Sequence, residues 1–347
     1  MTAEAELGSV DLDAVDPVRT LRLADIPEVA PEQRWLVEGL WPSEGVGVVA
    51  ATAKVGKTWI AADIGISVAS ATPFAGHFPV QRAGRVIMFA SEDRNHEMKT
   101  RVLGLARARN LPLQDLAFEL VDEPMLTLNR PMDLGRLERR IRDDRPALVI
   151  LDPLRRVCSG HESSSDAMSL VLTQFRRIQR QYSVAILLTH HITKQSEHDP
   201  VSGHSLRGSS DIHAWGDVNL FVWRSRDDES ISIVRGEYRN SPPQPPFLLR
   251  RVLGADPTGI RSTHIEYMPG DPATLGATAA NNETADLQER LLAVLSEAQH
   301  GLGFNALRIQ LGVGAEKVSA VLKELEQAGL VAKVGRVWTS RSVPPAP

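Results

Sequence analysis

Short apolar runs alternate with longer segments of helical periodicity along the first two thirds of the chain. The runs are GVGVVA, RVIMFA, FELV, ALVIL, VAILLT and VNLFVW, and turn residues bound them. Continuous aliphatic and β-branched runs, separated by segments that can form helices, are typical of parallel strands buried on both faces. The pattern therefore predicts an α/β fold with a mainly parallel sheet.

The apolar runs come closer together after Trp223. The segments SISIVRGEYRN, PPFLLRRVLG and GIRSTHIEYM follow one another with Pro and Gly between them, which predicts a small antiparallel extension at one edge of the sheet. The core is expected to close near Met268. Residues 269–284 lack periodicity and are rich in small and polar residues, so they are interpreted as a linker.

The segment after this linker has a helical pattern of its own. Leucines at helical spacing in LQERLLAVL predict a first helix, FNALRIQLG predicts a short second one, and the apolar stripe of VSAVLKEL predicts a third. The segment LVAKVGRVWT then predicts two strands that turn around Gly335. Three helices followed by a hairpin form the winged-helix arrangement. Residues 285–342 are therefore predicted to be a winged-helix domain, and residues 343–347 a tail.

Composition supports a folded protein with one large and one smaller domain. The chain has 347 residues, of which 42% are hydrophobic and 24% charged, and such values are usual for globular proteins. Residues 1–16 differ, because they hold five acids and no base; residues 1–32 are interpreted as an acidic flexible tail and lead-in. The net charge of −4 means that nucleic-acid binding requires a local basic patch.

Cysteine content and hydropathy exclude several classes of protein. The single cysteine, Cys158, excludes a disulfide framework and a cysteine-based zinc site. Membrane-spanning helices need about 18 consecutive apolar residues, and the chain has no such run. Acids stand at the N-terminus where a signal peptide needs bases. The sequence therefore predicts a cytoplasmic protein that does not associate with membranes.

A loop of the phosphate-binding type directly follows the first predicted strand. In such a P-loop the backbone N–H groups and the next helix N-terminus meet the phosphates, a lysine reaches the β and γ phosphates, and the following hydroxyl ligates Mg²⁺. Lys57 and Thr58 hold these two positions, which predicts ATP and Mg²⁺ as cofactors. The residues expected at the nucleotide are Ala51, Thr52, Ala53, Lys54, Val55, Gly56, Lys57, Thr58 and Trp59.

One position departs from the usual GxxxxGK[ST] pattern. Ala51 stands where the first glycine is usual, a change that matters if this position needs a positive φ. Gly56, where the backbone comes closest to phosphate, is retained. The competing interpretation is a chance GKT sequence at a strand-to-helix turn, and the flanking strand and helix favour the P-loop.

Acids at the ends of two other predicted strands complete the candidate site. Asp152 ends the run ALVILD and is predicted to hold the Mg²⁺ water shell, as the Walker B acid; a capping role before Pro153 is the alternative. Glu92 and Asp93 follow the second strand, beyond the end where ligands bind in open α/β sheets. Glu92 is predicted to be the general base for hydrolysis, and its alternative role is that of a helix N-cap.

These segments together resemble the RepA-like branch of the RecA-like P-loop ATPases, a group of hexameric helicase relatives. The resemblance covers roughly residues 33–268 and rests on WLVEGLWP, KVGKTW, ASED, LDPLRR, THHITK and SLRGSSDIHAWGD in this order. It implies a RecA-like ATPase domain over these residues, in which Glu92 activates water. It also implies a homo-oligomer, a hexameric ring with single-stranded DNA in its channel.

The resemblance further implies a γ-phosphate sensor on the strand VAILLT, which His190 and His191 follow. Consecutive strand residues face opposite ways, so one of the two is expected to point at the nucleotide; His190 is preferred and His191 remains the alternative. Metal binding by the pair is disfavoured, because partners at ligand spacing are missing from the sequence. Arg207 is expected to reach a neighbouring subunit's nucleotide, where a guanidinium stabilises charge on the transferring phosphoryl group.

Four further basic residues are weaker candidates for contacts with phosphate. Lys194 and Arg101 are candidates at the nucleotide, and Arg155 and Arg156 lie in the loop after the Walker B strand, which is expected to face the channel. Each of the four is also explained as an ordinary surface residue.

The sequence therefore favours an ATP-hydrolysing, RepA-like ring ATPase that acts on DNA, a replicative or mobile-element helicase. The alternative is an ATP-switched DNA-binding regulator, scaffold or defence ATPase without unwinding activity; a small-molecule kinase is disfavoured. Winged helices usually bind DNA through the third helix and the wing. Residues 286–347 hold seven bases and six acids, whereas DNA binding favours a clear excess of bases, so a protein-docking role stays open.

Overall fold

The structure, a computed structural model, gives the fold of most of the chain. It describes residue 18 and residues 20–340, except residues 124–125, 155–164, 193–209, 227, 243, 256–260, 271–286, 297, 299–300 and 336. The acidic residues 1–16, most of the predicted linker and the predicted C-terminal tail lie outside these described residues, whereas residue 18 and residues 20–32 of the predicted lead-in are described and contain a short 3-10 helix at Leu23–Asp25.

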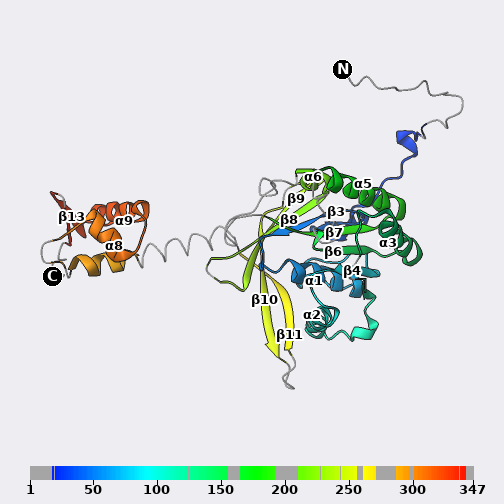
Figure 1. The fold of residues 1–347 in the computed structure, drawn as a ribbon, viewed down its shortest axis with the longest axis horizontal. Coiled ribbons are helices and arrows are strands. Elements are labelled where there is room, and N and C mark those ends of the chain that lie inside the picture. The colour runs from blue at the N-terminus through cyan, green and yellow to red at the C-terminus, as the bar shows by residue number, and fades with distance from the viewer. Residues whose placement is uncertain are drawn as a thin grey trace, which may run out of the picture.

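A nine-stranded sheet forms the centre of the larger part of the fold (Figure 1). Its strands are β3 (Val46–Ala51), β4 (Val86–Ala90), β5 (Phe118–Leu120), β6 (Leu148–Asp152), β7 (Ala185–His191), β8 (Val218–Arg224), β9 (Ile231–Tyr238), β10 (Phe247–Ala255) and β11 (Arg261–Met268). They lie in the order β11-β10-β9-β8-β3-β7-β6-β4-β5. The strands from β8 to β5 in this order are parallel, and β9, β10 and β11 extend β8 antiparallel. The structure confirms the predicted α/β fold with a mainly parallel sheet.

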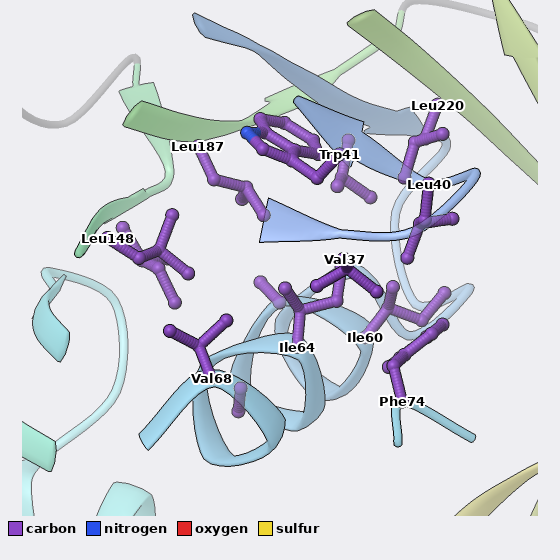
Figure 2. Packing of buried hydrophobic residues seen from close by; sticks show 14 of the residues in the cluster. Val37, Leu40, Trp41, Ile60, Ile64, Val68, Phe74, Leu148, Leu187 and Leu220 are labelled. Atoms are coloured by element: carbon purple, nitrogen blue, oxygen red, sulfur yellow. The ribbon is translucent and has the colours of Figure 1, made fainter. Parts of the chain in front are cut away.

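Helices cover both faces of this sheet. On one face α1 and α2 pack with the short strands β1 and β2, and on the other face α3, α5 and α6 pack together. Figure 2 shows the first of these cores, in which Trp41 lies between the sheet and α1. The elements are α1 (Lys57–Ser70), α2 (Asn95–Arg107), α3 (Pro131–Asp144), α5 (Ser165–Tyr182), α6 (Ser210–Trp215), β1 (Trp35–Val37) and β2 (Trp41–Pro42).

Successive residues of each central strand enter opposite cores. In β3, Val49 packs on the α1 side and Val48 on the α5 side, and in β7 Leu187 and Leu188 divide in the same way. Both faces of the strands are therefore buried, which is why their sequences are continuously apolar. The same alternation decides which side chains at the strand ends reach the α1 side of the sheet.

A buried ion pair fixes α2 against α1. Asp63, in α1, is completely buried, and the guanidinium of Arg109, just beyond α2, lies 2.7 and 2.8 Å from its two carboxylate oxygens. Burial raises the pKa of Asp63, and the charge of Arg109 opposes this rise. The pair therefore ties the segment that follows α2 to α1.

The C-terminal residues form helices and strands around a separate apolar core. Residues 287–296 are helical, and the strands pair in the order β12-β14-β13. The three helices and the hairpin expected from the sequence are present, whereas the two-residue strand before the second helix was too short to predict. The named elements are β12 (Leu302–Gly303), α8 (Phe304–Leu311), α9 (Ala315–Gln327), β13 (Val331–Val334) and β14 (Val337–Ser340). Their core includes Leu291, Leu307, Val318 and Leu322.

The tight contact between β3 and β8 generates a prediction about stability. A Cβ atom on Gly47 would overlap the backbone carbonyl of Val218, whereas a Cβ on Gly135, exposed in the interior of α3, would meet no atom within 4 Å. We expect Gly47→Ala to lower the free energy of unfolding by at least about 2 kcal/mol. The control Gly135→Ala should raise it by about 0.5 to 1 kcal/mol through helix propensity. Urea titrations of both variants measure this, and equal effects would contradict the packing.

Candidate nucleotide-binding site

The predicted P-loop connects β3 to α1. Gly56 has a left-handed conformation, with φ 106° and ψ 22°, and forms the N-cap of α1, so that the chain can turn into the helix at Lys57. Ala51 is the last residue of β3 and is fully buried. It pairs with His191 and Val222 in the sheet. An extended strand position needs no glycine, which explains why alanine can replace the usual residue here.

The loop side chains divide between the core and the surface. Thr52 is buried and Val55 packs into the core on the α1 side, whereas Ala53 and Lys54 are exposed. Val55 therefore offers the nucleotide its backbone only. Lys54 lies at the tip of the loop in a left-handed conformation, with φ 67°, which is costly for a residue with a side chain.

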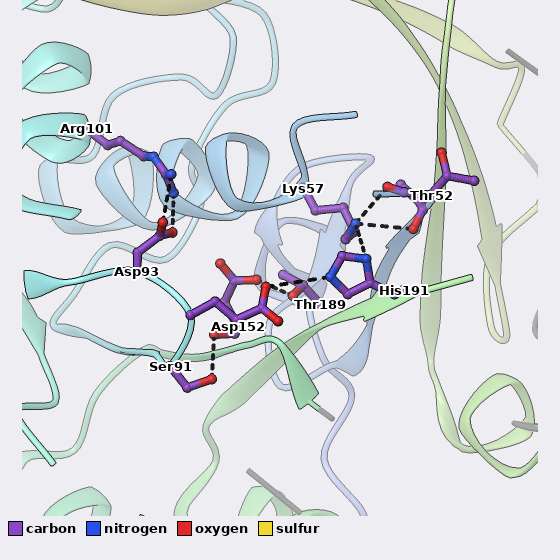
Figure 3. A network of polar contacts seen from close by, with 10 residues as sticks. Thr52, Lys57, Ser91, Asp93, Arg101, Asp152, Thr189 and His191 are labelled. Carbon is purple, nitrogen blue, oxygen red and sulfur yellow. Dashed lines mark hydrogen bonds and ion pairs between the residues drawn. The ribbon is translucent and has the colours of Figure 1, made fainter. Parts of the chain in front are cut away.

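Lys57 buries its ammonium group under the loop. The Nζ atom donates to the carbonyl oxygens of Ala51, at 3.2 Å, and Thr52, at 2.9 Å, and lies 3.2 Å from Nδ1 of His191 (Figure 3). Burial lowers the pKa of Lys57 from 10.5 to about 8, although the negative charges of Asp152 and Glu92 favour the protonated form. The site thus contains a desolvated cation, which interacts strongly with an anion.

Asp152 lies at the carboxyl end of β6, buried beside the loop. It accepts a hydrogen bond from the hydroxyl of Thr189, in β7. Burial raises the pKa of this carboxyl, and hydrogen bonds from Thr189 and Thr58 oppose the rise. The structure therefore brings Thr58 and Asp152 together, as the predicted Mg²⁺ site requires. Thr189 was missed by the sequence analysis, because its role depends on β7 lying between β3 and β6.

Glu92 and Asp93 lie in the loop between β4 and α2 and have different surroundings. The backbone N–H of Ser91 donates to the carbonyl of Asp152 at 2.9 Å, which ties this loop to β6. Asp93 forms a two-pronged ion pair with Arg101 of α2, whose Nη2 lies 2.9 Å from Oδ1. The Oε2 atom of Glu92 instead lies 3.8 Å from Nε2 of His191. Glu92 therefore faces the site.

The alternative role of Glu92 as a helix cap is not realised. Helix α2 starts at Asn95 with Arg94 as its N-cap, and the backbone N–H of Arg94 donates to the carboxylate of Glu97 at 3.2 Å. The N-terminus of α2 is thus capped by a residue within the helix. This leaves the carboxylate of Glu92 to the cleft.

Of the two histidines, His191 and not His190 lies in the cleft. His191 follows Leu187 and Thr189 on the α1 side of β7, where Lys57 also lies. His190 pairs with Ala50 and belongs to the other face of the sheet. Burial and the charge of Lys57 lower the pKa of His191, so that its neutral form is favoured. The geometry does not support the preference for His190, since strand alternation turns that residue away.

Arginines from the antiparallel edge complete the surroundings of the loop. Arg224, at the end of β8, donates to the carbonyl of Lys54 at 2.6 Å. The guanidinium groups of Arg101 and Arg251 lie over the indole of Trp59, with 5.5 and 6.0 Å to the ring centroid. The sequence analysis missed Arg224 and Arg251. Arg224 directly follows an apolar run, VNLFVW, which offered a signal of the kind used for Asp152; Arg251, inside β10, offered none.

An open cleft of about 240 Å³ lies at the carboxyl ends of the parallel strands, and its lining includes Lys57, Thr58, Glu92, Asp152, His191 and Arg251. In the part of the chain that the structure describes, no group of three or more His, Cys, Asp or Glu residues could hold a metal ion by itself. A divalent cation here would be held by Thr58, Asp152 and the phosphates of a nucleotide, which are the oxygen donors that Mg²⁺ prefers.

Several predicted residues cannot be placed. Arg207, Lys194, Arg155 and Arg156 lie outside the described residues.

Among the described helices, none has the length and apolarity needed to cross a membrane.

Comparisons with known proteins identify a family match and a similar fold. A family described as an AAA domain matches residues 14–197, more than half of the chain. Solved structures similar to the chain include one described as the crystal structure of the RadB recombinase. It is 15% identical, has a TM-score of 0.46, and the match covers 65% of this chain and 92% of that chain. The search of curated proteins found no match.

The burial of Lys57 predicts a dependence of stability on pH. The unfolded chain keeps the proton on this lysine up to about pH 10.5, whereas the folded protein releases it near pH 8. Because the unfolded state then binds more protons, the contribution of Lys57 to the free energy of unfolding rises between these two pH values. In Lys57→Met this rise should be lost.

Urea titrations across this pH range, without nucleotide, measure the effect as the difference between the variant and the parent protein. Lys99→Met, which removes an exposed lysine of α2, serves as the control for the loss of one positive charge. A difference between Lys57→Met and the parent that stays constant with pH would show that the ammonium is not desolvated.

Proposed function

The chain belongs to the family of AAA domains, which are ATPases, and on this premise we propose that it is an ATP-hydrolysing, RepA-like ring ATPase that acts on DNA. The observation that carries the proposal is the meeting of Lys57, Asp152 and Glu92 at one cleft beside the P-loop. They come from three separate segments of the chain. A structural role for each residue alone does not explain why the three converge.

The loop and the start of α1 are proposed to bind the phosphates of ATP. Helix α1 begins at Lys57, and the first N–H groups of a helix have no acceptor within it, so anions bind favourably at this end. The ammonium of Lys57 exchanges the carbonyl oxygens of Ala51 and Thr52 for phosphate oxygens. Mg²⁺, held by Thr58 and Asp152 together with the nucleotide, would neutralise charge on the β and γ phosphates.

Glu92 is proposed as the general base that orients and deprotonates the attacking water. Its carboxylate lies next to His191, which in turn contacts Lys57. His191 therefore takes the place of His190 as the proposed γ-phosphate sensor, because it bridges the base and the residue that reaches the γ phosphate. Asp93 is less suited to act as the base, since Arg101 binds both of its oxygens.

Assembly into a homo-oligomeric, hexameric ring is part of the proposal. The segment before β1 exposes several large apolar side chains, a feature that is typical of interaction surfaces when such side chains gather in one patch. A neighbouring subunit in a ring would provide such a surface, and Arg207 is proposed to reach that subunit's nucleotide. The exposed side chains are those of Val18, Leu21, Leu23, Ile26 and Val29.

Residues 285–342 are proposed to act as a winged helix that contacts DNA through α9 and the β13–β14 hairpin. The order of three helices followed by a hairpin supports this proposal. The near balance of acids and bases in this segment favours protein docking instead. The second proposed function is that of an ATP-switched DNA-binding regulator, scaffold or defence ATPase that does not unwind DNA.

Strand separation distinguishes the two functions. We expect the full chain to hydrolyse ATP, to hydrolyse it faster with single-stranded DNA, and to separate a partial duplex only in the presence of ATP. Lys57→Ala, which removes the charge placed on the β and γ phosphates, should abolish hydrolysis. ATPase activity without strand separation would favour the regulator, and equal hydrolysis by Lys57→Ala would reject the P-loop site.

Glu92→Gln tests the identity of the base. The amide keeps the shape of the side chain but cannot accept a proton, so ATP binding should persist while the turnover rate falls by about 100-fold or more. Calorimetry with ATP and a phosphate-release assay measure the two effects. The neighbouring Asp93→Asn should retain most of the turnover; loss in Asp93→Asn with normal turnover in Glu92→Gln would move the base by one residue.

Mixed assemblies test the proposed action of Arg207 across subunits. Arg207→Ala and Lys57→Ala should each be inactive alone, because one lacks the arginine and the other lacks the P-loop lysine. Mixing them should restore part of the ATPase activity, at interfaces where an intact P-loop meets an intact arginine. If the two variants assemble together but remain inactive, Arg207 does not act in the neighbouring site.

A further inference from the structure

The cleft has a second cationic side, formed by arginines around Trp59. Arg101, Arg224 and Arg251 come from α2, β8 and β10, and their side chains gather beside the start of α1. Arg101 is neutralised by Asp93, and Arg224 donates to the carbonyl of Lys54 and lies 3.4 Å from the carboxylate of Glu229. Two of the three arginines therefore have clear partners.

Arg251 differs from these two. Within the described residues its side chain makes no hydrogen bond or ion pair, and its guanidinium lies over the ring of Trp59. Its backbone is fixed, because its N–H donates to the carbonyl of Ser230 at 2.9 Å. Burial, together with the like charges of Arg224 and Arg101, lowers the pKa of Arg251. A half-buried cation among other cations is unfavourable unless an anion joins it.

The position of Arg251 identifies the anion by its chemistry. A Cβ atom on Gly56 would lie 4.0 Å from Nη1 of Arg251, so the guanidinium adjoins the P-loop backbone. Arg251 lines both the cleft that holds Lys57 and a smaller hollow on the far side of Trp59. Glu92 and Asp152 line only the first of these. The guanidinium thus borders the cleft that holds Glu92 and Asp152 and also extends past Trp59, where these two acids do not line the surface.

We propose that Arg251 binds the α and β phosphates of the nucleotide held by its own P-loop. A P-loop backbone cradles the α and β phosphates while its lysine reaches the β and γ phosphates, and Arg251 lies on the α side of this arrangement, beside Gly56 and Trp59. The inference rests on the proposed nucleotide function and adds to it a residue from the antiparallel edge. A guanidinium suits this role because it can bind two phosphate oxygens at once.

Calorimetry with ADP and with ATP, using the full chain, tests the assignment. Removing a charged hydrogen bond costs about 10- to 100-fold in affinity, so Arg251→Ala should bind both nucleotides more weakly by this factor and to the same extent. Arg250→Ala is the matched control, because Arg250 is the preceding arginine of β10 and contacts Glu266 instead; it should bind as the parent protein does.

Steady-state kinetics provides a second readout. A residue that holds the α and β phosphates equally in the ground state and the transition state should raise KM and leave kcat nearly unchanged. Glu92→Gln should instead lower kcat and leave KM nearly unchanged. If Arg251→Ala does not fold, Arg251→Gln and Arg251→Lys replace it: the glutamine variant should lose affinity, and the lysine variant, which keeps the charge, should recover part of it.

Three outcomes would overturn the inference: unchanged affinity of a folded Arg251→Ala or Arg251→Gln, an effect confined to ATP, or an equal loss in Arg250→Ala. An effect confined to ATP would place the arginine at the γ phosphate.

The failure of this inference can be distinguished from the failure of the proposed function. In the first case the parent protein binds ATP and Lys57→Ala loses activity, whereas in the second the parent protein neither binds nor hydrolyses ATP.

Discussion

The desolvated ammonium of Lys57 is the constraint on which the rest of the site depends. A cation removed from water has to be compensated by dipoles and negative charges, and here the carbonyl oxygens of Ala51 and Thr52 act at short range while Asp152 and Glu92 act through their charge. Each compensating group lies at or just beyond the carboxyl end of a parallel strand. The order of the strands in the sheet therefore places the groups that offset the desolvation of this lysine.

Much of this arrangement follows from local sequence signals. The continuous apolar runs predict the sheet, GKT after the first run predicts the loop, and acids directly after later runs predict Asp152 and Glu92, because each signal lies within a few residues of the feature it predicts. The sequence did not contain the order of the strands. Thr189 meets Asp152 only because β7 lies between β3 and β6.

The histidine pair marks the limit of what strand alternation predicts from the sequence. Alternation along β7 separates His190 from His191, and the residue on the side of α1 meets Lys57. The sequence shows this alternation but does not show whether the odd- or the even-numbered residues of β7 face α1. That depends on the register between β3 and β7. Arg251 lay further out of reach, because an arginine inside an antiparallel strand has no local signature and reaches the loop only through the folding of the sheet edge.

The distribution of charge gives the cleft a direction. Glu92, Asp152 and Lys57 line the cleft but not the smaller hollow beside Trp59, whereas Arg251 lines both, and Arg224, paired with Glu229, lines the hollow only. A nucleoside triphosphate bound along this axis meets the base and the proposed Mg²⁺ ligands only at its terminal phosphates, and meets the arginines nearer its nucleoside. A nucleotide bound in the opposite orientation would have its nucleoside beside the acids and its terminal phosphate away from the proposed base. Under the proposed function, the charges that compensate the buried lysine therefore also favour this orientation of the nucleotide.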